Sequence, residues 1–259
     1  MTNSNVRDDH ELARDLATDA GELLLRLRDK AGFADPRVLR DTGDRESHEY
    51  LMAALARTRP GDAVLSEEGK DDPARLAATR VWIVDPLDGT REFAEEGRTD
   101  WAVHVALWEA GRLTAGAVAL PAQGRTLGTY DPPALPARDG GPVRIAASRT
   151  RAPALVEDLA RRLDEEGVGA ELVPMGSAGA KIAAVLQGTV DAYLHAGGQY
   201  EWDSAAPVAV VQAAGAHATR IDGTPLTYNQ ADPYLPDILV SRPELGAMLL
   251  TGVRDVAPS

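Results

Sequence analysis

Apolar residues follow two different periods along this chain of 259 residues. Leucines at helical spacing predict a first helix from Asp8 to Ala31, which ends at Gly32. A second helix is expected from Asp44 to Arg59. The run Val81–Val84 has no polar alternation, and this pattern predicts a strand that is buried on both faces.

Strands and helices are mixed in the rest of the sequence. Residues 101–108 and 113–120 are expected to pair as a hairpin. Further strands are expected near Val143, Glu171, Val190, His217 and Ile238, and further helices near Ala152, Ala178 and Glu244. This alternation predicts an α/β fold. The Pro- and Gly-rich stretch 131–142 is the best candidate linker, so we expect an N-terminal metal-binding α+β subdomain (1–140) and a C-terminal α/β substrate subdomain (141–259).

The stretch Asp85-Pro-Leu-Asp88-Gly-Thr90 directly follows the central apolar run. Pro86 disfavours a helical conformation for Asp85, so the chain is expected to turn where the strand stops. Gly89-Thr90 should open a helix, whose free N–H groups suit an anion. Two carboxylates beside such a helix start are the oxygen ligands that a Mg²⁺ and phosphate site needs. The alternative is an Asp-Pro turn followed by an Asp N-cap.

Acidic residues also stand at the ends of three other predicted elements. Glu67-Glu68 follows a short apolar strand, where a solvated turn is the alternative. Asp203 lies at the start of an Ala-rich helix, where an N-cap is the alternative. Asp44 precedes the second predicted helix, and for this residue the N-cap is the favoured interpretation.

Taken together, the Glu-Glu stretch, the D-P-L-D-G-T motif and the W-D-S-A-A motif resemble the inositol monophosphatase superfamily. Glu92-Phe93 after the central motif, and Gly176-Ser-Ala-Gly179-Ala-Lys181 further on, look more like its 3'(2'),5'-bisphosphate nucleotidase branch, the CysQ type. The likeness extends from near Glu11 to near Val240, and it implies the alternating helix and sheet layers of the inositol monophosphatase and fructose-1,6-bisphosphatase fold. Thr42-Gly43-Asp44 keeps only part of the family's T-x-A-D pattern, which leaves a supporting role for Asp44 in doubt.

The resemblance also implies a metal site with two or three Mg²⁺ ions. One ion would be held by Glu67, Asp85 and the backbone carbonyl of Leu87. The second would be held by Asp85, Asp88 and Asp203. Carboxylates and carbonyls without cysteine or clustered histidine agree with Mg²⁺.

Catalytic and substrate-binding roles follow from the same resemblance. Glu67, assisted by the Thr90 hydroxyl, would orient or deprotonate the attacking water, and Glu68 could share this role. The N–H groups of Gly89 and Thr90 would hold the phosphate. No protein nucleophile is required, since phosphoryl transfer needs positioning and charge neutralisation.

A substrate with two phosphates needs a second anion site, which we place at Ser177 and Lys181 in the start of another predicted helix. The alternative is that Ser177 only caps this helix and that Lys181 is solvated. Ser148-Arg149 is a weaker candidate for the same task. Glu201, just before the W-D pair, is expected to face the leaving-group sugar.

The expected activity is Mg²⁺-dependent and lithium-sensitive removal of the 3'-phosphate from 3'-phosphoadenosine 5'-phosphate, giving AMP and recycling a by-product of sulfur assimilation. Inositol-1-monophosphatase and fructose-1,6-bisphosphatase activities are the alternatives within the class. A catalytically inactive, metal-stabilised binding module is the alternative from another class. Loss of a motif acid would have favoured that module, and none is lost.

Composition and missing motifs exclude several other functions. The net charge of −13 leaves no basic footprint for a nucleic-acid polymer. A membrane partner is not expected, because no apolar run reaches transmembrane length. The chain lacks cysteine and a signal-peptide pattern, so we expect a cytoplasmic protein. The expected partners are a small phosphorylated substrate and, as one option, a second copy of the chain.

Three further catalytic or metal-binding patterns are missing from the sequence. The five histidines show no H-x-x-x-H spacing, which disfavours zinc, and His104 is expected to be a packed residue inside a strand. No G-x-S-x-G elbow is present. The stretch from Gly176 to Lys181 lacks the spacing and the hydroxyl residue of a P-loop.

Overall fold

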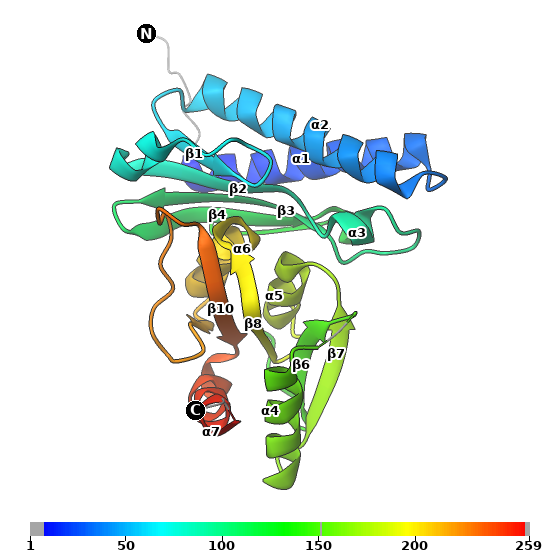
Figure 1. The fold of residues 1–259 in the computed structure, drawn as a ribbon, viewed down its shortest axis with the longest axis vertical. Coiled ribbons are helices and arrows are strands. Elements are labelled where there is room, and N and C mark those ends of the chain that lie inside the picture. The colour runs from blue at the N-terminus through cyan, green and yellow to red at the C-terminus, as the bar shows by residue number, and fades with distance from the viewer. Residues whose placement is uncertain (1–7, 151, 257–259) are drawn as a thin grey trace.

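Two long helices, α1 (Asp9–Ala31) and α2 (Pro36–Thr58), form the outer layer at the top of Figure 1. The computed structural model describes residues 8–150 and 152–256. The first predicted helix is confirmed, and Asp8 caps it by accepting the N–H of Glu11 at 2.7 Å. The predicted start of the second helix is wrong. Asp35 is its N-cap and Pro36 its first residue, so Asp44 lies well inside α2.

The first sheet lies beneath these helices and has the strand order β1-β2-β3-β4-β5. Its strands are β1 (Ala63–Ser66), β2 (Arg80–Asp88), β3 (Ala102–Glu109), β4 (Arg112–Leu120) and β5 (Arg125–Gly128). Short helices follow three of them: η1 (Pro73–Ala77), α3 (Thr90–Phe93) and η2 (Pro121–Gln123). β1 and β2 are parallel, whereas the other neighbours are antiparallel, including the predicted hairpin of β3 and β4.

Both faces of β2 are buried, as the apolar run predicts. Val81 and Ile83 face the central core of the molecule, whereas Trp82 and Val84 belong to the core beneath α1 and α2. The period of two thus places successive side chains in two different cores. β2 continues to Asp88, further than predicted, although its pairing with β3 becomes irregular after Asp85.

The second sheet has the strand order β7-β6-β8-β10-β9, with helices on both faces. Its strands are β6 (Val143–Ser148), β7 (Ala170–Met175), β8 (Ala192–Tyr200), β9 (His217–Thr219) and β10 (Tyr234–Ser241). The helices of this half are α4 (Ala154–Glu165), α5 (Ala178–Leu186), α6 (Glu201–Ala213) and α7 (Gly246–Val256), with the single turn η3 (Pro243–Leu245) before α7.

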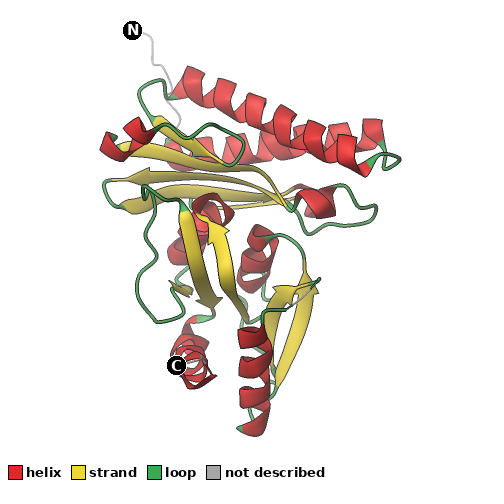
Figure 2. Ribbon diagram, in the orientation of Figure 1, coloured by secondary structure: helices red, strands yellow, loops and turns green. Residues whose placement is uncertain are grey.

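Helices and sheets therefore alternate in five layers, as Figures 1 and 2 show. α5 and α6 pack between the two sheets, and the core around them contains residues from both halves of the chain. α4 and α7 cover the outer face of the second sheet. Residues 131–142 lie outside every helix and strand, and the division into two subdomains there stays a prediction. Within the described residues, no helix has the length and apolar character needed to span a membrane.

Candidate active site

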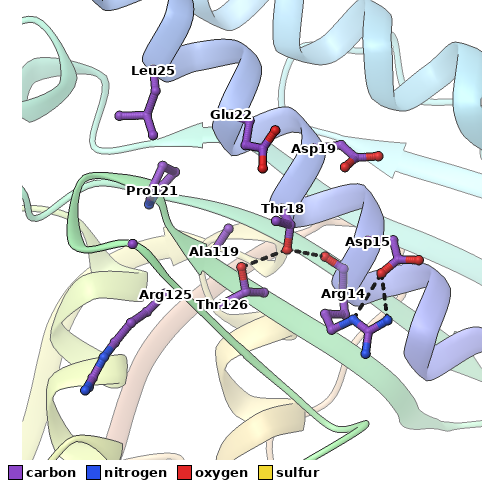
Figure 3. Close-up of a pocket in the computed structure, with 11 residues that line it drawn as sticks. Arg14, Asp15, Thr18, Asp19, Glu22, Leu25, Ala119, Pro121, Arg125 and Thr126 are labelled. Atoms are coloured by element: carbon purple, nitrogen blue, oxygen red, sulfur yellow. Dashed lines mark hydrogen bonds and ion pairs between the residues drawn. The ribbon is translucent and has the colours of Figure 1, made fainter.

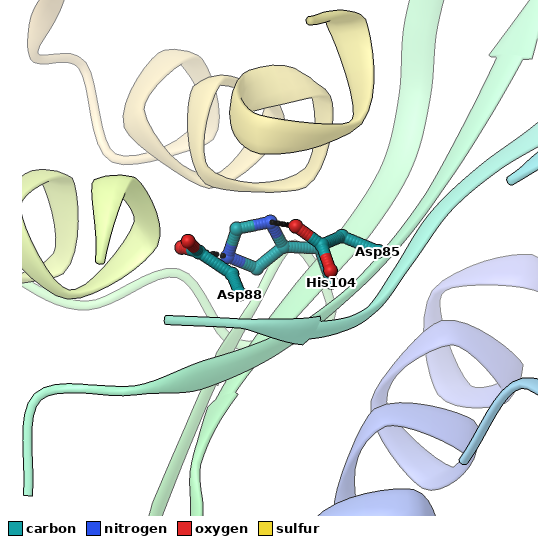
Figure 4. Close-up of side chains that lie close together, drawn as sticks. All are labelled: Asp85, Asp88 and His104. Carbon is teal, nitrogen blue, oxygen red and sulfur yellow. Dashed lines mark ion pairs between the residues drawn. The ribbon is translucent and has the colours of Figure 1, made fainter. Parts of the chain in front are cut away.

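The irregular end of β2 brings two acidic side chains together beneath α5 and α6. Asp85 pairs with His104 of β3 and Asp88 with Ala102, and the register shifts between these two pairs. Asp85 is 1% exposed and Asp88 is 7% exposed. Ligand atoms of Asp85, Asp88 and His104 all lie within 4.8 Å of one another. Figure 4 shows the His104 ring between the two carboxylates. The three residues are thus close enough to share one ion.

The Asp85 carboxylate is only half satisfied by hydrogen bonds. Its Oδ1 accepts the N–H of Leu87 at 3.0 Å. Its Oδ2 is buried and has no hydrogen-bond partner in the described part of the chain. Burial raises the pKa of Asp85, and the negative charges of Glu67, Asp88 and Asp203 raise it further. A buried, unpaired carboxylate oxygen among other acids is a site that a cation would stabilise.

Glu67 and Asp203 come to this cluster from distant parts of the chain, after β1 and at the start of α6. Loss of surrounding water, followed by the charge of Asp88, raises the pKa of Asp203 to about 7. The Glu67 residue is partly accessible to solvent, yet loss of surrounding water raises its pKa to about 7 as well. The charges of Asp203 and Asp88 raise this pKa further. The structure therefore gathers the four acidic side chains proposed as ligands.

Asp88 also holds the start of α5. Its carboxylate accepts the N–H of Gly179 at 2.6 Å and that of Ala178 at 3.3 Å. These two amides, which adjoin the expected anion site at Ser177 and Lys181, are already occupied by Asp88 in this structure. Negative charge at a helix start is favourable, so this contact stabilises α5 as well as fixing the Asp88 side chain.

His104 is fully buried, as expected of a packed residue, but it lies beside the acidic cluster. Its Nδ1 lies 3.0 Å from the carbonyl oxygen of Trp202, which can only accept a hydrogen bond. Burial lowers the pKa of the ring. In the neutral ring with the proton on Nδ1, the lone pair of Nε2 faces a carboxylate oxygen of Asp88 at 3.3 Å. The sequence did not place His104 here, because a histidine in a strand carries no sign of its neighbours.

Asp44 reaches the same region from the middle of α2. The Thr90 hydroxyl lies 3.5 Å from its Oδ1 and 3.2 Å from the carbonyl oxygen of Leu87. Burial, with the charge of Glu68 as the next cause, raises the pKa of Asp44 to about 7. The N-cap interpretation of Asp44 is therefore wrong, and its carboxylate is a neighbour of the Thr90 hydroxyl.

Lys181 and Ser177 share a cleft with the acidic cluster. The cleft has a volume of about 400 Å³, and its lining includes Asp88, Gly89, Ser177, Lys181 and Asp203. Ser177 caps α5, since its Oγ accepts the N–H of Ala180 at 2.8 Å. Gly89 packs against Ser177 at φ +85°, where an added Cβ would lie 2.7 Å from the Ser177 Cβ. A side chain at residue 89 would therefore obstruct this cleft.

The Lys181 ammonium makes no hydrogen bond or ion pair with the residues that the structure describes. It is 6% exposed and lies 5.2 Å from the centre of the Tyr193 ring, so it is not the solvated surface lysine of the alternative interpretation. Burial lowers its pKa, whereas the charge of Asp88 opposes this effect. The cleft thus contains a buried ammonium group that forms no direct ion pair with the described residues, close to a group of carboxylates.

Two other expectations about substrate contacts are corrected. Glu201 is 1% exposed, does not line the cleft, and accepts the N–H groups of Asn229 at 2.6 Å and Gln230 at 2.7 Å. It therefore holds a loop and does not face a sugar. Arg149 forms ion pairs with Glu92 at 2.8 Å and Glu95 at 2.7 Å, so its charge is already matched.

A second hollow lies on the other side of the first sheet, between α1 and the loop from β4 to β5, as Figure 3 shows. Thr18 on its wall bonds to Thr126 at 2.8 Å and to the Arg14 carbonyl at 2.7 Å. None of the proposed metal ligands lines it. The hollow is separate from the candidate active site.

Comparison with known proteins agrees with this geometry. The family model for the inositol monophosphatase family matches residues 8–255. The chain belongs to the inositol monophosphatase family. It is 54% identical over 260 residues to 3'-phosphoadenosine 5'-phosphate phosphatase of Mycobacterium leprae (strain TN). This match covers 96% of this chain and 94% of that protein. It is 30% identical to 3'(2'),5'-bisphosphate nucleotidase CysQ of Escherichia coli (strain K12), over 85% of this chain and 94% of that protein.

Solved structures also place the chain in this family. CysQ from Bacteroides thetaiotaomicron superimposes with a TM-score of 0.78 at 28% identity, and the match covers 91% of this chain and 97% of that one. Inositol monophosphatase family members are metal-dependent. The unpaired Asp85 oxygen and the closeness of Asp85, Asp88 and His104 fit a metal ion at this site.

Proposed function

We propose that this family member is a Mg²⁺-dependent phosphatase that removes the 3'-phosphate of 3'-phosphoadenosine 5'-phosphate and releases AMP. The unpaired Lys181 ammonium in the cleft of the acidic cluster carries this proposal, because a substrate with a second phosphate would neutralise it. The names of the Mycobacterium leprae and Escherichia coli relatives support the same substrate. A cytoplasmic enzyme is part of this proposal, and a homodimer stays a prediction.

Oxygen atoms alone would hold the metal in this assignment. The proposed ligands are the carboxylates of Glu67, Asp85, Asp88 and Asp203 and the backbone carbonyl of Leu87. Such a ligand set suits Mg²⁺, with two or three ions in the site. When bound, Mg²⁺ would supply the positive charge that stabilises the phosphate oxygens, the attacking water and the leaving oxygen.

The chain's own residues would place the water and move its proton. The ionised Glu67 carboxylate can accept a proton from this water, which suits a general base. The Thr90 hydroxyl, between Asp44 and the Leu87 carbonyl, is positioned to orient the same water. No covalent intermediate is needed, because positioning and charge neutralisation provide most of the acceleration in phosphoryl transfer.

The rest of the cleft would hold the substrate. The N–H groups of Gly89 and Thr90 would bind the 3'-phosphate at the start of α3. Lys181, with the Ser177 hydroxyl, would bind the 5'-phosphate through a charge-assisted hydrogen bond. Inositol 1-phosphate has no second phosphate for Lys181, so we expect it to be a poorer substrate.

Phosphate release with Mg²⁺ tests the proposal. The purified chain is assayed with 3'-phosphoadenosine 5'-phosphate, inositol 1-phosphate and fructose 1,6-bisphosphate, each with Mg²⁺ and with EDTA. We expect the nucleotide to give the highest kcat/KM, with AMP as product and no turnover in EDTA. A higher kcat/KM for inositol 1-phosphate would overturn the substrate assignment, and turnover in EDTA would overturn the metal assignment.

A further inference from the structure

Arg75 is a buried arginine that has no part in the reaction proposed above. It lies in η1, between the Glu67 loop and β2, and it is 1% exposed. Its guanidinium donates to both carboxylate oxygens of Asp71, from Nε at 2.7 Å and from Nη2 at 3.1 Å. A charged group is rarely buried to this extent unless its hydrogen bonds are satisfied, so its other partners need to be identified.

These partners come from a loop more than 150 residues further along the chain. Arg75 Nη1 donates to Asn229 Oδ1 at 2.7 Å, and Nη2 donates to the carbonyl oxygen of Gln230 at 2.8 Å. Asn229 Nδ2 in turn donates to the carbonyl oxygen of Arg75 at 3.4 Å. The contacts run in both directions and tie η1 to the loop that precedes β10.

Glu201 binds the backbone of the same loop. Its Oε2 and Oε1 accept the N–H groups of Asn229 at 2.6 Å and Gln230 at 2.7 Å. Asn229 has φ +60°, a left-handed conformation that asparagine adopts more readily than most residues. Two charged side chains, those of Arg75 and Glu201, therefore hold a single backbone turn in this conformation.

The two ends of this network lie close in sequence to Glu67 and Asp203, the two proposed metal ligands outside β2. Glu67 precedes η1 by a short loop, and Glu201 starts α6 two residues before Asp203. Asp85 and Asp88 are fixed by β2 itself. The negative charges of Glu67 and Asp203 repel each other, so a tie between their segments opposes their separation.

We propose that Arg75, Asn229 and Glu201 are positioning residues that keep Glu67 and Asp203 ready to bind divalent metal. This inference rests on the metal site proposed above. Ligands already held in place lose less conformational entropy on binding than ligands that must be ordered. Loss of the network therefore weakens metal binding beyond its effect on the stability of the fold.

The test compares two variants of the full chain that each remove one buried guanidinium. Arg75→Met breaks the network. Arg242→Met is the matched control, because Arg242 is 3% exposed and binds Asp191 at 3.1 Å and the Pro136 carbonyl at 2.6 Å, at the opposite end of β8. Binding of Mn²⁺, which accepts the same oxygen ligands, is measured from the loss of the free-ion electron paramagnetic resonance signal. Unfolding temperatures are measured in EDTA.

Both variants should unfold at lower temperature than the wild type. Only Arg75→Met should raise the Kd for Mn²⁺, by about tenfold or more, which corresponds to roughly 1.4 kcal/mol. Arg242→Met should leave the Kd within about twofold of the wild type. An unchanged Kd in Arg75→Met, or an equal rise in both variants, would show that the network is only structural.

Asn229→Gly keeps the experiment decisive if Arg75→Met does not fold. Glycine accepts the positive φ and retains the N–H that Glu201 binds, while the amide contacts to Arg75 are lost. Its Kd should also rise, by about threefold or more, and an unchanged value overturns the proposal.

If the wild type binds no Mn²⁺, the metal site itself is wrong and this inference is overturned with it. If the wild type binds Mn²⁺ and turns over the nucleotide while Arg75→Met binds equally well, only this inference is wrong.

Discussion

The Asp88 carboxylate accepts the backbone N–H of Gly179 at 2.6 Å and so joins the end of β2 to the start of α5. β2 carries three of the proposed metal ligands, the carboxylates of Asp85 and Asp88 and the carbonyl of Leu87. α5 carries Lys181, the proposed contact for the second phosphate. One hydrogen bond therefore couples the position of the metal site to that of the substrate cation. The tolerance of this region to substitution should be small.

Asp88→Asn should remove activity while preserving the fold. Asparagine can still accept an N–H at the start of α5, so the unfolding temperature in EDTA should change little. The lost charge should lower kcat by at least on the order of 100-fold and reduce the rise in unfolding temperature caused by Mg²⁺. Asp41→Asn, an exposed site on α2, is the control and should match the wild type in both assays. Near wild-type kcat in Asp88→Asn would show that this carboxylate is not a ligand.

Gly179→Ala should destabilise the protein and also lower its activity. An added Cβ would lie 1.9 Å from Nε2 of His104 and 3.0 Å from Oδ2 of Asp88, so α5 or His104 must move. Forcing an extra methyl group into a packed site costs about 1–3 kcal/mol. Thermal unfolding and kcat measure the two effects. Gly61→Ala, whose Cβ would meet no atom within 4 Å, should change the free energy of unfolding by less than about 0.5 kcal/mol. Equal stability of the two variants would contradict the packing described here.

The central strand and the motif acids could be predicted because their signals are local. Val81–Val84 lacks polar alternation, and the structure divides these residues between two cores. This pattern depends on neighbouring residues alone and is visible without a structure. That Glu67, Asp85 and Asp203 would meet was expected only from the resemblance of the three acidic stretches to the inositol monophosphatase superfamily.

The predicted position of Asp44 at a helix start was wrong for two reasons, one local and one that involves distant contacts. Asp35-Pro36 is itself a helix-start signal, and the predicted helix began after it. Gly43 precedes the predicted start at Asp44, yet it lies inside α2, where a Cβ would meet Phe93 at 2.8 Å and Leu87 at 3.0 Å. A glycine required by packing cannot be distinguished from a helix-breaking glycine in one sequence.

Partners far apart in sequence could not be predicted either. Glu201 adjoins the W-D motif, which favoured a role at the substrate, but its carboxylate binds the amides of Asn229 and Gln230. Arg75 lies in a polar stretch between two predicted strands, yet its side chain is buried. Burial of a charged residue depends on tertiary contacts, and the local composition gives no sign of it.

The metal-free protein should become less stable as the pH rises from 6.5 to 8. Glu67 and Asp203 have pKa values of about 7 in the folded chain, above their ordinary values of 4.5 and 3.8. Their neutral forms therefore stabilise the fold at low pH, and this contribution is lost as the pH rises through about 7. Buried His104 has a lowered pKa and acts in the opposite direction, mainly below its ordinary value of 6.5, which is why the window starts there.

Mg²⁺ should reverse this trend, since it binds the ionised carboxylates. At a concentration of 100 Kd, a ligand stabilises the folded state by about 2.7 kcal/mol. Unfolding temperatures at pH 6.5, 7.2 and 8, each with EDTA and with Mg²⁺, measure both effects. A metal-free unfolding temperature that stays constant or rises across this window would contradict the raised pKa values.

Lys181→Met should selectively impair hydrolysis of the bisphosphate nucleotide. Methionine has a similar length and avoids leaving a cavity beneath Tyr193, while the ammonium is lost. A hydrogen bond to a charged group contributes roughly 1.5–3 kcal/mol. If Lys181 binds the 5'-phosphate in the transition state, kcat/KM for 3'-phosphoadenosine 5'-phosphate should fall by about 10- to 150-fold. Inositol 1-phosphate has no group for this position, so its kcat/KM should change by less than about threefold. Lys30→Met, at an exposed site on α1, controls for the loss of one positive charge. Equal losses on both substrates would indicate a general defect of the site, and no loss on either would remove Lys181 from the substrate contacts.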